Sequence, residues 1–178
     1  MGLIQVATAT VDTSGGAVND VQLIGTTEDA VYLMTATGIK IASDGTYLQT
    51  RVVKAGTTQS ATNYKDAAKV LRSNSGFDNY FNSGTPRSEL YFCGAQPQGN
   101  DHGETSGCYW WLYNFNSSSQ YSFIMGQDYQ TQYTGTAVGG NAGGTCYAVA
   151  EAHNGISISG YATNFNDGGR FTLYKVVN

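Results

Sequence analysis

Two short runs in the last quarter of the chain alternate between apolar and polar residues, and this alternation limits the fold more than any other feature. The run Gly155 to Ser159 places isoleucine and serine at alternate positions, and the run Gly168 to Val176 alternates in the same way. A period of two sends successive side chains to opposite faces of a β-strand. The chain is therefore predicted to end in two strands that each present one face to a core.

Similar runs recur along the rest of the chain, separated by Gly-, Asn-, Asp- and Ser-rich turns. They cover residues 3–11, 18–24, 30–41, 46–54, 88–93, 108–115, 120–125 and 145–150. This spacing predicts an all-β fold, an antiparallel β-sandwich that is jelly-roll-like, with about ten strands and at most one or two short helices. Residues 1–17 would form an N-terminal strand or arm, and residues 18–178 the sandwich domain.

Three segments carry more specific expectations. Ser43-Asp44-Gly45 is a strong hairpin signal between the runs 30–41 and 46–54. Residues 63–74 place Tyr64 and Leu71 on one helical stripe, so a short helix and an irregular strand are both open there. The Gly-rich residues 135–144 are predicted to form a loop.

Composition and charge argue against several function classes. The formal net charge is −4, and the basic residues are scattered singly, so no patch is available to neutralise nucleic-acid phosphates. No apolar run approaches the roughly 18 residues that a membrane span needs. The N-terminus lacks the basic and apolar regions of a signal peptide, which predicts a protein made in a cytoplasm. We expect no nucleic-acid partner, no membrane and no cofactor.

No catalytic or metal-binding pattern emerges. The three cysteines, Cys93, Cys108 and Cys146, match no zinc spacing and are expected to be unbridged and buried as small apolar residues. The acidic loop from Gly99 to Thr105 could offer oxygen ligands to Ca²⁺, although an exposed polar loop is the simpler interpretation. The glutamates are far apart in sequence, and no Gly-x-Ser-x-Gly elbow occurs. The expectation is a protein that is not an enzyme and holds no metal.

The aromatic segment from Cys108 to Phe115 contains both tryptophans of the chain. On a strand, Tyr109, Trp111, Tyr113 and Phe115 would share one face, while the residues between them would face the core. Flat rings in a row can bury the apolar face of a sugar, and they can equally pack in a core or against another subunit. Tyr109, Trp111 and Tyr113 are therefore the candidate contacts for a glycan or a partner.

Taken in order, several motifs carry a family resemblance. They are Val31-Tyr32-Leu33, Ser43-Asp44-Gly45, Tyr47 to Val52, Leu112 to Ser119, Ile156 to Ser159 and Gly169 to Tyr174. In this order they resemble the β-sandwich domain found in virion proteins of tailed bacteriophages, particularly marine and cyanobacterial ones, over residues 18–176. Lys175, where that pattern often has Gly, and the long loop of residues 96–106 depart from it.

The resemblance implies a non-enzymatic structural protein of the virion, made in the host cytoplasm. A compact chain without a repetitive shaft favours a capsid decoration or cement protein, and a tail-fibre or receptor-binding tip protein is the alternative. The expected partners are copies of the chain itself, as a homotrimer, together with major capsid or tail proteins and, for a tip, host-surface glycans. An alternative of another class, based on the Trp-Trp segment, is a free lectin-like carbohydrate-binding module.

Overall fold

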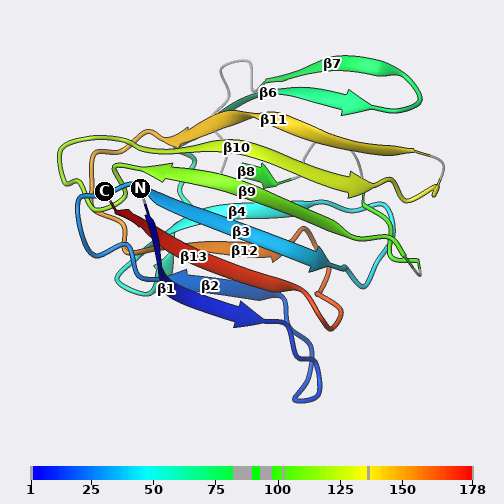
Figure 1. Ribbon diagram of the computed structural model, residues 1–178, viewed down its shortest axis with the longest axis horizontal. Helices are drawn as coiled ribbons and strands as arrows, with labels where there is room; N and C mark the ends of the chain where they lie inside the picture. The colour runs from blue at the N-terminus through cyan, green and yellow to red at the C-terminus, as the bar shows by residue number, and fades with distance from the viewer. Residues whose placement is uncertain (1, 82–89, 93–97, 102, 136, 178) are drawn as a thin grey trace.

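Two antiparallel β-sheets pack face to face and confirm the predicted β-sandwich (Figure 1). The computed structural model describes residues 2–81, 90–92, 98–101, 103–135 and 137–177. These residues form thirteen strands and no helix, which exceeds the predicted ten strands. Within these ranges there is accordingly no helix that could cross a membrane.

The larger sheet has eight strands, ordered β1-β13-β3-β9-β10-β11-β6-β7. In that order their bounds are Gly2–Thr10, Arg170–Val177, Tyr32–Ile39, Ser106–Tyr113, Ser122–Thr131, Val138–Tyr147, Tyr64–Arg72 and Gly76–Phe81. The first and last strands of the chain, β1 and β13, pair from Gly2 with Val177 onward, so the two termini lie together (Figure 1). The N-terminal segment is thus a strand of the chain's own sheet. It is the edge strand of that sheet, with β13 on one side.

The smaller sheet has five strands, with β2, β12, β4 and β5 in that order and β8 also paired with β4. Their bounds are Asp20–Ile24, Gly155–Gly160, Leu48–Lys54, Thr57–Thr58 and Leu90–Phe92, respectively. The central strand β12 joins β2 and β4, which are separated from it by more than a hundred positions in sequence.

Apolar side chains from the inner faces of both sheets form one core. The larger sheet contributes Tyr32, Met34, Trp110, Leu112 and Leu173, and the smaller sheet contributes Val21, Leu23, Val52, Ile156 and Ile158. Removing this apolar surface from water is the main stabilising term of such a fold. Each core strand consequently sends its alternate residues to an outer face, and those two outer faces carry the candidate sites.

The hairpin predicted at Ser43-Asp44-Gly45 is wrong, because β3 and β4 belong to different sheets. The connection between them crosses from the larger to the smaller sheet. Residues distant in sequence stabilise this connection. Asp44 Oδ1 accepts a hydrogen bond from the backbone N–H of Asn100 at 2.7 Å, and Ile41 forms a β-bridge with Phe165. Partners far along the chain therefore stabilise the turn that the local residues favour.

Two other local expectations fail for the same kind of reason. Residues 64–72 form the regular strand β6, paired along its full length with β11, so the helical alternative is wrong. The predicted glycine-rich loop is instead the start of β11, which runs from Val138 to Tyr147. A Cβ atom at Gly143 would lie 2.4 Å from the carbonyl oxygen of Ala67. Glycine therefore permits the close approach of β11 to β6.

Candidate functional site

The aromatic segment lies on β9, and the prediction that it alternates between two faces is confirmed there. Cys108, Trp110 and Leu112 are buried in the core, while Tyr109, Trp111 and Tyr113 lie on the outer face of the eight-stranded sheet. The register places Trp111 between Leu33 of β3 and Met125 of β10. The three candidate residues are thus together, as expected, and are partly or largely accessible.

Phe115 does not belong to this row, and its predicted place on the outer face is wrong. Asn114, just past the end of β9, has a φ of 60°, in the left-handed region. This turns the chain and places Phe115 fully in the core. Asparagine tolerates that backbone conformation better than most residues, which is the local reason that the alternation stops after Tyr113.

The row borders an open depression of about 410 Å³ on the outer face. Met125 and Gln127 of β10 form the opposite side, and Gly126, Gly143 and Gly144 complete the lining. A Cβ atom at Gly126 would lie 2.1 Å from the carbonyl oxygen of Tyr109. Glycine is therefore required here for β9 and β10 to pair closely beside the aromatic rings.

Apolar residues continue across the same face beyond the row. They are Phe123 and Tyr129 on β10, Val138 on β11, Leu71 on β6 and Phe77 on β7. Phe77, which is opposite Leu71 in the register, is 76% exposed, and Met125 is 52% exposed. We call this set, together with Tyr109, Trp111, Tyr113 and Met125, the aromatic face.

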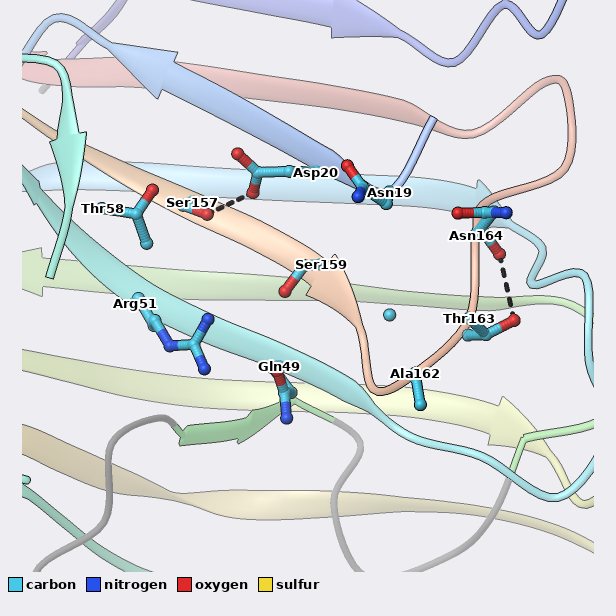
Figure 2. Close-up of a pocket in the computed structure, with 11 residues that line it drawn as sticks. Asn19, Asp20, Gln49, Arg51, Thr58, Ser157, Ser159, Ala162, Thr163 and Asn164 are labelled. Atoms are coloured by element: carbon cyan, nitrogen blue, oxygen red, sulfur yellow. Dashed lines mark hydrogen bonds between the residues drawn. The ribbon is translucent and has the colours of Figure 1, made fainter. Parts of the chain in front are cut away.

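The outer face of the five-stranded sheet has the opposite character. It holds a polar pocket of about 500 Å³ (Figure 2), which we call the polar trough. Its lining comprises Asn19, Asp20, Gln49, Arg51, Thr58, Ser157, Ser159, Gly160, Ala162, Thr163 and Asn164. Figure 2 shows these side chains coming from β2, β12, β4, β5 and the loop after β12.

Strand register explains how the floor of the trough is assembled. Ser159 of β12 is opposite both Asp20 of β2 and Gln49 of β4, and Ser157 is opposite Arg51. The Ser157 hydroxyl donates to Asp20 Oδ1. Three strands thus contribute alternate polar residues to two parallel rows, while the residues between them fill the core.

Sequence reasoning missed the polar trough. The signal was present in each strand separately, because polar residues alternate with core residues in β2, β4 and β12. What the sequence did not reveal was that β12 lies between β2 and β4. Only that arrangement brings the polar positions together.

A buried serine, a buried histidine and a partly exposed glutamate form a hydrogen-bonded array at another place in the sandwich. The Ser122 Oγ and His153 Nδ1 atoms are 2.8 Å apart, and His153 Nε2 lies 3.3 Å from Glu151 Oε1. An ionised carboxylate only accepts hydrogen bonds, so Nε2 carries the proton and Nδ1 accepts from the serine hydroxyl. Lys54 donates to the other carboxylate oxygen of Glu151.

Burial determines the protonation of this array. It lowers the pKa of the His153 imidazole, an effect that the hydrogen bond to Glu151 offsets in part. The hydrogen bond from Lys54 lowers the pKa of Glu151. The histidine ring packs edge-on against Tyr147, with ring centres 5.1 Å apart, and both Ser122 and His153 are closed to solvent. The same residue types serve nucleophilic catalysis in hydrolases, but here they connect elements inside the fold.

The remaining sequence candidates are placed as follows. Within the acidic loop, Glu104 is buried and its Oε2 accepts from the Asp101 backbone N–H at 2.8 Å, which ties the loop to itself. The described part of the chain contains no group of three potential metal-binding side chains, and His102 lies outside it. Cys108 and Cys146 are free thiols, as predicted. Cys108 is buried, but Cys146 is partly exposed, so its expected burial is wrong, because its position on β11 faces outward. Cys93 lies outside the described residues.

Comparison with protein-family models, with curated proteins and with solved structures finds no match for this chain. The resemblance to tailed-phage virion domains therefore stays a prediction from the motifs of the sequence. The function is argued below from the two outer faces.

Proposed function

We propose that this chain is a non-enzymatic structural protein on the surface of a tailed-phage virion, and that it acts as a capsid decoration or cement protein. The observation that carries the proposal is the aromatic face, which stays exposed although the core between the sheets is complete. Monomeric soluble proteins rarely expose contiguous apolar patches that extend over several strands. The order of strand motifs in the sequence supports the same function class.

The chemistry of the aromatic face suits contact with protein. Tyrosine, tryptophan, phenylalanine and methionine are enriched in the buried centres of interfaces, where charged residues are depleted. On β9 and β10, the outward positions of the face carry Tyr109, Trp111, Phe123, Met125 and Tyr129 and no charged residue. Lys65 and Lys69 lie on β6, two strands away from β10, on the same side of that strand as Leu71.

The proposed occupants are further copies of the chain, in a homotrimer, and the major capsid protein beneath it. In a trimer the interface is heterologous, so one part of the broad face would contact a different part of the next copy. Each square ångström of apolar area that such a contact buries contributes about 25 cal/mol. A cement protein would use that contribution to hold capsid subunits together.

A tail-fibre or receptor-binding tip is the second candidate, with a lectin-like module as its counterpart outside a virion. The observation that favours it is the depression between Tyr109, Trp111 and Tyr113 and the glycines of β10 and β11. Glycines leave the rings uncovered on that side, and a pyranose could stack on them. In this alternative the aromatic face binds host-surface glycans.

The oligomeric state tests the assembly role of the aromatic face. Met125→Asp places a carboxylate at the centre of the face, and Ile24→Asp, a matched exposed apolar residue on the outer face of the other sheet, is the control. By light scattering at micromolar concentration, the wild-type chain and the Ile24→Asp variant should be trimers, and the Met125→Asp variant a folded monomer. A monomeric wild-type chain would overturn the self-association part of the proposal.

Particles that lack the protein test the virion role. If it is a decoration protein, such particles assemble but release DNA at a lower temperature than wild type. If it is a tail tip, they are as heat-stable as wild type but fail to adsorb, and Trp111→Ala weakens adsorption. Particles that match wild type in both assays would contradict the virion role in either form.

A further inference from the structure

We propose that the polar trough on the five-stranded sheet is a binding site for a neutral saccharide. This inference does not depend on the proposed virion function, since it concerns the opposite face of the sandwich and different residues. It rests on the shape of the pocket, on a buried side chain without a partner, and on the balance of charge in the lining.

The trough is a concave surface of a size suited to a small ligand. Its volume of about 500 Å³ lies within the range of small-molecule sites. The floor is formed by β2, β12 and β4, and the β4–β5 hairpin bends over it, since Gln22 Nε2 of β2 donates to Thr58 Oγ1 of β5 at 3.0 Å. Ala162, Thr163 and Asn164, in the loop after β12, form another side of the pocket, as Figure 2 shows.

Gln49 supplies the observation that points to a ligand. Its side chain lines the trough and is only 6% exposed, and its amide is not among the fully enclosed polar atoms, so the exposed part of the side chain is the amide that faces the trough without a partner in the described part of the chain. Buried polar groups in native proteins are almost always hydrogen-bonded, to protein or to something bound beside them. An amide offers both donors and an acceptor, so it fits a partner that has both functions, as a sugar hydroxyl does.

The charge of the lining selects a neutral ligand. Among the described lining residues Asp20 is the one carboxylate and Arg51 the one guanidinium, so these two formal charges cancel. Asp20 would repel an anion and Arg51 would repel a cation, so either ion would lose at one group what it gains at the other. A polyol can donate to Asp20 and accept from Arg51 at the same time.

Other side chains of the lining can also both donate and accept hydrogen bonds. Ser159 lies in the register row between Asp20 and Gln49, and the hydroxyl and amide groups of Thr58 and Asn164 border the pocket. The described lining residues include no aromatic or large aliphatic side chain, so they offer little apolar surface to an apolar ligand. A ligand with several hydroxyls is the class that this set can satisfy.

Calorimetric titration and saturation-transfer NMR of the full chain test the proposal. The probes are glucose, galactose, mannose and N-acetylglucosamine, with N-acetylneuraminic acid and glucosamine as charged comparators. At least one neutral sugar should bind in preference to both charged ones. Asp20→Asn and Arg51→Gln should each weaken that binding about tenfold, the effect of losing one charge-assisted hydrogen bond. Ser159→Ala, at a partly exposed position, should weaken it too and guards against a misfolded Asp20 variant.

Asp29→Asn removes an exposed carboxylate outside the trough and should leave the affinity unchanged. Absence of binding by all four neutral sugars would overturn the proposal, and so would preferential binding of either charged sugar. If Trp111→Ala abolishes sugar binding while the trough variants do not, the site is the aromatic face and the inference is wrong. The trimer assay with Met125→Asp has its own readout, so failure of one proposal can be told from failure of the other.

Discussion

The aromatic face on the eight-stranded sheet and the polar trough on the five-stranded sheet differ in the residues that alternate with the core. On β9 and β10 the outward positions carry Trp111 and Met125, whereas on β12 they carry Ser157 and Ser159. Most inward positions of the three strands are apolar or small, with the buried Asp128 and Gln130 of β10 as polar exceptions, and the backbone pattern is the same. The comparison teaches that one folding rule, a buried face on each core strand, leaves the opposite face free to acquire different chemistry.

The largest effect expected from this comparison is on stability, at two adjacent positions of β9. Leu112→Ala removes a fully buried side chain and should cost about 2–5 kcal/mol of unfolding free energy. Trp111→Ala removes a larger side chain from the outer face and should cost less than about 1 kcal/mol in the monomer. Urea unfolding of the two variants measures the difference. Equal losses would mean that Trp111 is part of the folded core and not of a binding surface.

A smaller loss is expected at the glycine beside the aromatic rings. In Gly126→Ala, the new Cβ would overlap the carbonyl oxygen of Tyr109, so β9 and β10 must separate at a cost of about 1–3 kcal/mol. Gly15→Ala is the control, because no heavy atom lies within 4 Å of the Cβ position there. Thermal unfolding should show a clear decrease for the first variant and almost none for the second. An unchanged melting temperature for Gly126→Ala would contradict the close approach of the strands.

The array of Ser122, His153 and Glu151 should make the free energy of unfolding depend on pH. Since the folded-state pKa of His153 is below its ordinary value of 6.5, the unfolded chain binds the extra proton as the pH falls below 6.5. Stability should therefore decrease from pH 6.5 downward until the folded-state pKa is reached, by at most about 1.4 kcal/mol per pH unit. The pKa of Glu151 is also lowered, so its contribution is present above 4.5 and is lost at more acidic pH.

Urea midpoints between pH 7.5 and 5.5 measure this slope. In His153→Gln the slope should become shallower, while His102→Gln, which changes the other histidine of the chain, should keep it. If the wild-type slope survives in His153→Gln, another group is responsible for the pH dependence.

The smallest effect is kinetic and concerns the two described cysteines. Cys146 lies opposite Phe123 on the larger sheet and is partly exposed, whereas Cys108 is buried and burial raises the pKa of its thiol well above the usual range. Iodoacetamide should therefore label Cys146 faster than Cys108 in the native chain. If the aromatic face is covered in a trimer, Met125→Asp should speed the labelling of Cys146 and leave Cys108 unchanged. Peptide mass spectrometry follows both rates.

The strand pattern could be predicted from sequence wherever a period of two was visible. The runs that became β2, β4, β9, β12 and β13 were expected, as was the division of Tyr109, Trp111 and Tyr113 from Trp110 and Leu112. The failures were segments with mixed signals. β6 has a helical stripe in its sequence, and β11 begins in glycines that usually indicate a loop. Pairing with a neighbouring strand overrode both local preferences.

The candidate sites could likewise be predicted only where a single strand carries them. The row on β9 is a property of one strand, so alternation alone located it, whereas the array of Ser122, His153 and Glu151 joins β10 to a loop before β12. No local signal indicates that contact. A histidine without a motif could not be assigned a partner, because the elements that lie next to its loop are decided by the packing of the whole sandwich.

By itself, the sequence determined that the protein is made of strands and which side chains of most strands turn inward, because side-chain direction follows from the backbone period within a few residues. The tertiary structure decided which strands became neighbours. Asp20, Gln49 and Ser159 meet only because β12 inserts between β2 and β4. That choice depends on burying both inner faces in one core at once, which is a property of the whole chain and not of any one segment.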